Sequence, residues 1–333
     1  MPAVIGWLAV ISTLIFTPSG NLALLGLLAI IVYASFGVMR RADALARRLG
    51  EPFGTIILTL SIGVIEVAMV ASVLLGPGDH ASIARDTALS GAMILLNFIL
   101  GVAVLVGGLR HGSMRFQVAG ASQYIATILT LGSVTFVFPI LVDDAGALSG
   151  GYAAVVAVLI LVSYFFFMWR QLGANSGDFA ETEPAPRSDE PALHNFLWLV
   201  ATLIPIVLLS RAVSPLLDAA VTHTALAGLI IAAIVLLPET FTTFKAGWHG
   251  QLQRASNLTH GALISVVGLS VPAVLLIGAI TGQTVILGAG ANDLALLGLT
   301  MGLSVAVLAG RQATALHGLG HLLLFAMYIA SLV

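Results

Sequence analysis

The chain lacks cysteine and carries very little charge. Of its 333 residues, only 8% are Asp, Glu, Lys or Arg, and there is no Cys. The absence of cysteine excludes disulfides and thiolate metal sites. The scarcity of charge excludes an ordinary water-exposed globular surface, and the net charge of −2 provides no basic field to attract nucleic acid.

Apolar residues take the place of the missing charge. They make up 59% of the chain, and the mean hydropathy is +1.07, which predicts an all-α polytopic membrane protein. Apolar runs cut at charges and at Gly/Pro clusters predict about eleven transmembrane helices. The predicted spans are residues 3–17, 21–38, 53–76, 84–108, 117–141, 150–170, 194–214, 220–244, 257–281, 285–309 and 312–332. The first run has no basic start typical of a secretion signal, so we expect a retained helix.

Basic residues are distributed unevenly between alternate loops of this arrangement. One side holds only Arg85 and Arg211, and the other holds the remaining eleven of the 13 Lys and Arg residues. By the positive-inside rule, the N-terminus is expected in the cytoplasm and the C-terminus outside.

An acidic, proline-containing stretch divides the chain into two halves. Residues 171–193 are predicted to be a cytoplasmic linker that serves as a soluble tether between repeats at 19–170 and 194–333, and residues 1–18 form an extra N-terminal helix. The second to sixth spans match the seventh to eleventh. Because each repeat has five spans, the second must be inverted relative to the first, an arrangement found in many secondary transporters.

Very few acidic residues fall deep inside the predicted spans. Glu66 and Glu239 occupy corresponding helices of the two repeats, so an inverted pair is expected to bring their carboxylates together near the middle of the membrane. An ionised acid there costs about 2.5–3.5 kcal/mol on insertion scales, which makes both residues functional candidates. Two such acids cannot both stay ionised without a counter-charge, so we expect them to hold either protons or a cation.

The residues around these acids suit a hard cation. Ca2+ takes six to eight oxygen ligands in flexible geometry. Pro238 removes a helix donor and Gly63 weakens its helix, and both changes favour backbone carbonyls that face a cavity. The sequence therefore predicts Ca2+ ligation by Glu66 and Glu239.

Several longer segments carry a resemblance to a known family. They are LARRLGEPFGTIILTLSIGVIEVAMV, GGLRHGSMRFQVAGASQY, LLPETF, NLTHGALISVVGLSVPAVLL and AGRQATALHGLGHLLLFAMY. Together they resemble the bacterial calcium/proton antiporters, the proton-coupled branch of the calcium/cation antiporter superfamily. The resemblance implies that Glu66 and Glu239 bind cation and protons, and that Asn97, Ser265 and Gly268 complete the site. Many relatives have Gly-Asn-Ala before each acid, which this chain lacks, so the ion selectivity does not carry over.

Other polar residues leave alternatives open. Ser61 and Ser265 could offer hydroxyl oxygens, although such hydroxyls often bond their own helix. His317 and His321 are one turn apart and could bind a transition metal, or could simply be interfacial or hydrogen-bonded. His260 could shuttle protons, but an exposed vestibule histidine is the commoner role.

These observations favour a secondary transporter of the bacterial inner membrane rather than an enzyme. We expect it to export Ca2+ in exchange for protons by alternating access, with no cofactor beyond the transported ions. The alternatives are a Na+ or K+/proton antiporter on the same scaffold, a passive cation channel and an intramembrane metalloenzyme. The expected partners are Ca2+ or a monovalent cation, protons and the lipid bilayer; the sequence does not determine the oligomeric state.

Overall fold

A computed structural model describes residues 1–49, 53–76, 78–181, 190–221 and 223–332 of the chain. At positions 53–56, 58 and 59 only the backbone is described. The chain divides into two compact units, Met1–Thr87 with Pro184–Pro238, and Ala88–Glu183 with Glu239–Val333. Each unit is considered by itself.

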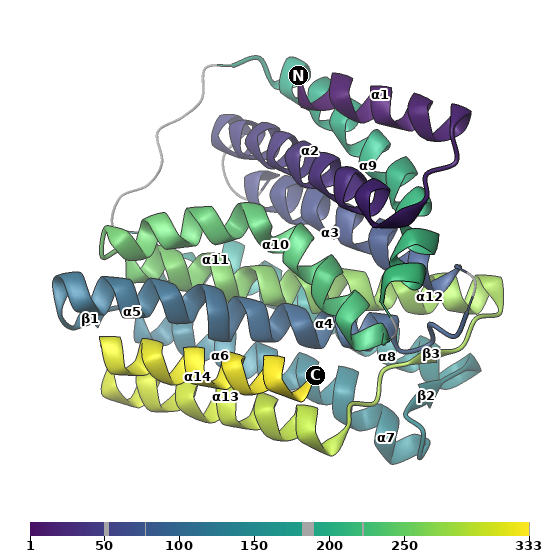
Figure 1. The fold of residues 1–333 in the computed structure, drawn as a ribbon. Coiled ribbons are helices and arrows are strands. Elements are labelled where there is room, and N and C mark those ends of the chain that lie inside the picture. Colours follow the sequence, from purple (N-terminus) through teal and green to yellow (C-terminus); the bar gives the residue numbers. More distant parts are fainter. Residues whose placement is uncertain (50–52, 77, 182–189, 222, 333) are drawn as a thin grey trace. The chain divides into compact units, whose positions relative to one another are not determined.

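The first unit is built from helices that begin in both halves of the sequence (Figure 1). Its elements are α1 (Pro2–Ile15), α2 (Gly20–Leu49), α3 (Phe53–Leu74), α9 (Ala192–Ala220), the start of α4 (Ile83–Ala92) and α10 (Thr224–Trp248) as far as Pro238. The matching helices α2 and α9 pack together over residues that are fully buried, among them Ile31, Ala34, Ile206 and Leu209.

The second unit contains the remaining spans, several of which are interrupted by π-helical turns. Its elements are η1 (Met93–Ile99), α5 (Leu100–His111), β1 (Met114–Arg115), α6 (Val118–Gly132), η2 (Ser133–Val137), α7 (Phe138–Val142), β2 (Ala147–Leu148), α8 (Gly150–Leu172), η3 (Ser176–Phe179), α11 (Leu252–Ser265), η4 (Val266–Ser270), α12 (Val271–Thr281), β3 (Val285–Ile286), α13 (Ala291–Gly310), β4 (Gln312–Ala313) and α14 (Ala315–Ser331). The ends of α4 and α10 also belong to it.

The predicted all-α membrane architecture is confirmed. Eight helical segments are long and apolar enough to cross a membrane, and three shorter apolar helices, Pro2–Ile15, Leu60–Leu74 and Ala315–Ser331, bring the described spans to eleven. Most ends agree with the predictions within a few residues. The second span differs most, because α2 continues to Leu49 through the arginine-rich stretch, whereas the prediction ended it at residue 38. The tenth span begins at Ala291 rather than at residue 285, because Val285 and Ile286 form strand β3.

Two short strand pairs reveal the relation between the repeats. Strand β1 lies in the loop after the fourth span and pairs with β4, which lies in the loop after the tenth span. The loop after the ninth span carries β3 and pairs with β2, in the loop after the fifth span. The fourth span matches the ninth, and the fifth matches the tenth. The loops that carry β1 and β4 therefore correspond to the loops that carry β3 and β2. The strand pairing therefore follows the inverted five-helix repeat.

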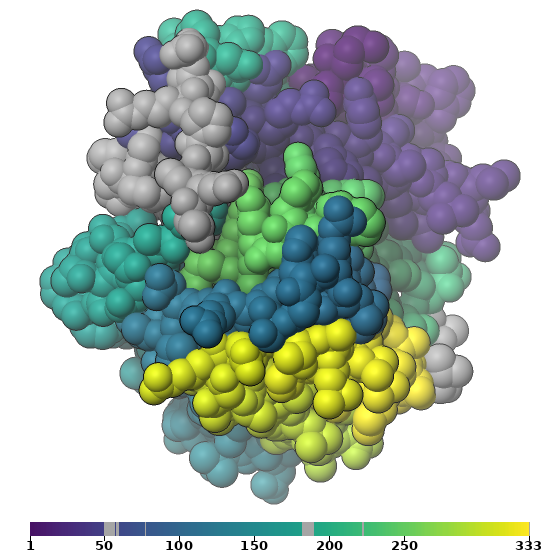
Figure 2. Space-filling model, turned by 90° about the vertical axis from the view of Figure 1, so that its left-hand side faces the viewer, coloured from purple at the N-terminus to yellow at the C-terminus, as the bar shows by residue number. Residues whose placement is uncertain are grey.

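Glycines in the second unit allow backbone segments to approach one another closely. Gly146 has a φ of +66° and lies against Gly288, where an added Cβ would meet the Gly288 Cα at 2.5 Å. Helices α5 and α14 also lie side by side, in blue and yellow in Figure 2. A Cβ at Gly318 would collide with the backbone nitrogen of Leu105 and lie 2.7 Å from the carbonyl oxygen of Gly101. Such small residues suit helix packing in lipid.

The first part of the predicted linker is not a free tether. Residues Gln171 and Leu172 still belong to α8, and Phe179 is buried with ring contacts to Tyr124 and Phe167. The Nε2 of Gln123 donates to Asp178 Oδ2 at 2.7 Å. An aromatic residue in an otherwise polar stretch explains the correction, since burying Phe179 removes its ring from water. Residues 182–189 lie outside the described part of the chain.

The close approach of α5 and α14 predicts an unusual cost for adding one methyl group. We expect Gly318→Ala to destabilise the protein by about 1–3 kcal/mol, because the methyl meets backbone atoms that cannot rotate away. Gly302→Ala in α13 is the matched control, since nothing lies within 4 Å of its added Cβ and alanine favours helix. Thermal unfolding in detergent measures both; an unchanged midpoint for Gly318→Ala contradicts this packing.

The docked linker also predicts a pH effect on stability. Burial raises the pKa of Glu181 above 4.5, while Arg254, whose Nε lies 3.9 Å from Glu181 Oε2, and a hydrogen bond with Asn257 oppose the rise. The folded protein therefore binds this proton more tightly than the unfolded chain does. The stabilising contribution is complete below pH 4.5 and is lost as the pH rises through the folded pKa.

Glu181→Gln should flatten the pH dependence of the unfolding midpoint above pH 4.5 relative to the unmodified protein. Asp144→Asn, an exposed acid in a loop of the same unit, serves as the control. Parallel pH curves for the Glu181 variant and the unmodified protein would rule out the effect.

Candidate functional site

Glu66 lies in the second half of α3 and is only 3% exposed. This helix packs against α2 and α9 within the first unit. Ser61 and Gly63, which precede the acid, are also buried. The Ser61 hydroxyl donates to the Ile57 carbonyl at 2.6 Å, so its proton is used within its own helix and only its lone pairs remain for other contacts.

Glu239 is equally buried, at 3% exposure, and follows Pro238 inside α10. A proline lacks the N–H that would bond the carbonyl of Ile234, so the helix ladder is open at this point. Thr243 lies one turn beyond Glu239 and is fully buried, and its hydroxyl has no hydrogen-bond partner among the described residues. The sequence analysis missed Thr243, although its i+4 spacing from the acid places both on one helix face.

The other supporting residues predicted from the sequence lie at π-helical turns in matching spans. Asn97 lies in η1 of the fourth span. Gly268 lies in η4 of the ninth span, and Ser265 is the residue just before η4. Such turns are rare and often mark functional sites, because the extra residue per turn frees backbone groups. Sequence patterns gave no indication of either turn.

Asn97 is fully buried and has protein partners at both ends of its amide. Its Nδ2 donates to Thr300 Oγ1 at 2.7 Å, and its Oδ1 lies 2.9 Å from His321 Nδ1. An amide buried in mid-helix is costly unless it is paired. The structure provides hydrogen bonds to neighbouring helices, from η1 to both α13 and α14.

Ser265 and Gly268 have local packing roles in the second unit. The Ser265 hydroxyl donates to the Gly261 carbonyl at 2.9 Å within its own helix. A Cβ at Gly268 would lie 2.7 Å from Tyr164 Cγ, so glycine lets α8 pack closely on η4. These contacts leave the Ser265 lone pairs and the η4 carbonyls as the oxygens that these residues could offer an ion.

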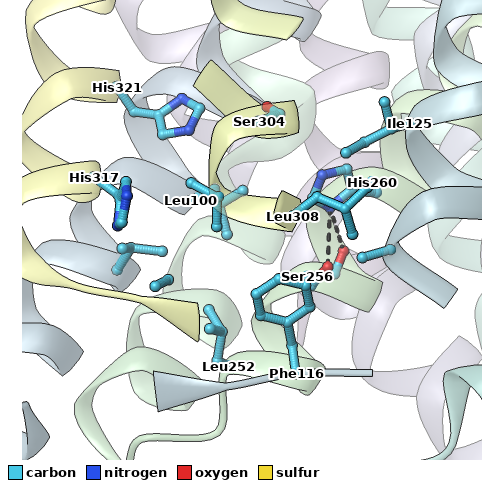
Figure 3. Close-up of a pocket in the computed structure, with 14 residues that line it drawn as sticks. Leu100, Phe116, Ile125, Leu252, Ser256, His260, Ser304, Leu308, His317 and His321 are labelled. Atoms are coloured by element: carbon cyan, nitrogen blue, oxygen red, sulfur yellow. Dashed lines mark hydrogen bonds between the residues drawn. The ribbon is translucent and has the colours of Figure 1, made fainter. Parts of the chain in front are cut away.

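Three histidines line one cavity of the second unit (Figure 3). His260 comes from α11, and His317 and His321 come from α14. The expectation that His260 is an exposed vestibule residue is wrong: it is 6% exposed and its ring stacks on Tyr124 with centroids 5.4 Å apart. The sequence could not reveal this burial because the residue lies near the end of its predicted span.

His317 and His321 are not arranged as a metal site. His317 caps the start of α14, where its Nδ1 accepts from the Thr314 backbone N–H at 3.1 Å, and His321 bonds Asn97. Among the residues that the structure describes, no group of three or more His, Asp or Glu side chains is placed to hold a metal ion. Both histidines are hydrogen-bonded within the protein, which is one of the roles expected for them.

Comparisons with known proteins agree with this architecture. The model of the sodium/calcium exchanger protein family matches residues 20–173 and 194–333. The chain is 31% identical to the sodium-potassium/proton antiporter ChaA of Escherichia coli over 326 residues, which cover 93% of this chain and 87% of that protein. It is 33% identical over 320 residues to the putative ionic transporter y4hA of Sinorhizobium fredii, covering 91% and 86%.

Solved structures with little sequence identity share the fold. The structure of native YfkE matches with a TM-score of 0.77 at 12% identity, covering 98% of this chain and 96% of that one. The H+/Ca2+ exchanger CAX matches with a TM-score of 0.73 at 14% identity, covering 99% and 86%. The family consists of membrane cation exchangers, so the protein is a transporter and not an enzyme. The chain belongs to the sodium/calcium exchanger protein family.

Proposed function

We propose that the protein exchanges a cation for protons by alternating access, and that Glu66 and Glu239 bind the two in competition. The observation that carries this proposal is one deeply buried glutamate in each inverted repeat of a cation exchanger, each with 3% exposure. A charge inside the hydrocarbon is costly without a partner of opposite sign. Either a proton or a cation removes that cost, and each excludes the other.

Ca2+ is the cation that the oxygen chemistry favours. Two carboxylates can be completed by backbone carbonyls at the Pro238 break and by hydroxyls such as that of Thr243. We expect Ser61, Gly63, Ser265 and Gly268 to support cation binding, and Asn97 holds η1 in place through its bonds to Thr300 and His321. No resident cofactor is needed, because the proton gradient supplies the work.

A monovalent cation is the second candidate, and a specific observation favours it. The Escherichia coli relative is named as a sodium-potassium/proton antiporter, with 31% identity over 93% of this chain. Na+ and K+ also bind oxygen ligands, so the same side chains would serve. The two candidates differ in how many protons must leave to balance the charge of the cation.

The direction of transport follows from the distribution of charge. Arg115 lies in β1, and Arg110 and Arg311 lie close to the β1–β4 pair, whereas Asp143 and Asp144 precede β2. We assign the basic end to the cytoplasm of a bacterial inner membrane, with the N-terminus inside and the C-terminus outside. Protons entering along their gradient would then drive the cation out.

Reconstituted proteoliposomes test the proposal directly. An imposed pH gradient should drive uptake or release of Ca2+, Na+ or K+, and a side-by-side comparison of the three ions identifies the substrate. Glu66→Gln and Glu239→Gln should each reduce exchange to background, because a neutral amide cannot balance the cation. Asp144→Asn, an exposed acid in a loop, is the matched control. Normal exchange by the Glu66→Gln, Glu239→Gln double variant would refute the proposal.

A further inference from the structure

The cavity lined by His260, His317 and His321, here called the histidine cavity, has the size and polarity to hold water. Its volume is about 50 Å3, and one water needs roughly 10–15 Å3 on this measure, so several molecules fit. Its walls come from α5, α6, α11, α13 and α14 and are otherwise mainly apolar, with Ser256 and Ser304 as the remaining polar residues. Figure 3 shows the histidines and both serines around this space.

A fixed chain of donors sets the protonation of His321. The Thr300 hydroxyl donates to the Leu296 carbonyl at 2.8 Å, so its oxygen accepts from Asn97 Nδ2. The amide oxygen of Asn97 is therefore left to accept from His321 Nδ1. A neutral His321 consequently carries its proton on Nδ1, and its Nε2 keeps a free lone pair.

A neutral His260 also carries its proton on Nδ1, whereas a neutral His317 carries its proton on Nε2. The Nδ1 of His260 lies 2.9 Å from the Ser256 carbonyl, which can only accept, so its Nε2 also keeps a lone pair. The Nδ1 of His317 accepts from the Thr314 N–H, so a neutral His317 has its proton on Nε2. The cavity is thus lined by one imidazole donor and two imidazole acceptors.

His317 also connects the cavity with the surroundings of the second unit. It is partly exposed in the first turn of α14, whereas His260 and His321 are 6% and 3% exposed. No Asp, Glu, Lys or Arg is found among the described residues that line the cavity. Among the described residues, Tyr124 of α6 is a further ionisable group in contact with these histidines, since it stacks on His260. Helix α5 contributes apolar side chains, and the polar side chains from η1 and α13 are those of Asn97, Thr300 and Ser304.

We propose that the histidine cavity is a proton relay of the exchanger, distinct from the two glutamates. A proton from solvent binds Nδ1 of His317 in place of the Thr314 N–H bond, beside the Thr314 hydroxyl oxygen 3.1 Å away, while Nε2 of His317 gives its own proton to a cavity water. That water gives a proton to Nε2 of His321 or His260. The water gains one proton and gives one up, so only O–H and N–H bonds change. A lasting charge in an apolar cavity is costly, so the proton is held briefly and passed on. This inference rests on the proposed exchange of cations for protons.

Measuring two kinds of flux separates the relay from the cation site. His321→Gln and His260→Gln should slow cation flux driven by a pH gradient by about ten-fold or more, with the largest loss at high pH, where protons are scarce. Exchange of labelled cation for unlabelled cation moves no proton and should stay within about two-fold of the unmodified protein. A purely structural defect would reduce both fluxes together and leave the pH profile unchanged.

Two further variants separate the role of the cavity from the effect of replacing a histidine. Ser304→Leu fills the cavity without removing a histidine, and it should slow the proton-driven flux in the same way. His249→Gln is the matched control, because His249 is an exposed histidine that bonds its own helix at the Lys245 carbonyl.

Proton-driven flux at the unmodified rate in both His321→Gln and Ser304→Leu would overturn the relay while leaving the glutamate exchange in place. Absence of any proton-driven flux in the unmodified protein would overturn both proposals.

Discussion

The cost of a polar group without a partner in hydrocarbon governs this structure. A charge or an unsatisfied amide inside a bilayer has no water to bond, so each must be paired within the protein or neutralised by an ion. Asn97 meets this requirement with Thr300 and His321. Glu66 and Glu239 meet the same requirement, in our proposal, by exchanging one neutralising ion for another. The constraint that stabilises the bundle is therefore also the source of its transport chemistry.

Inverted repetition supplies the scaffold and several of its local irregularities. The β1–β4 and β2–β3 pairs, and the π-helical turns η1 and η4, occur at positions related by the repeat. The histidine cavity has no such counterpart in sequence, since His317 and His321 belong only to the last span. We regard the repeated features as the exchange machinery and the unrepeated cavity as an addition specific to proton handling.

Hydropathy predicted the spans well because the bilayer imposes a length and a composition on each helix. It could not predict that residues 285–290 leave the helix, since Val285 and Ile286 are as apolar as the span that follows. The deep positions of the two acids were evident from sequence, whereas the burial of His260 and the partners of Asn97 depend on which helices pack together. Phe179 shows the same limit, because one of its ring partners, Tyr124, lies far away in sequence and belongs to another helix.

Proton release on cation binding is the measurement that tests the central claim most directly. Calorimetric titration of the detergent-solubilised protein with Ca2+, Na+ and K+, repeated in buffers of different ionisation enthalpy, counts the protons displaced. Competitive occupancy of Glu66 and Glu239 predicts about two protons released per Ca2+, or about one per monovalent ion, and no release by the Glu66→Gln, Glu239→Gln double variant. Cation binding that displaces no proton would contradict the account.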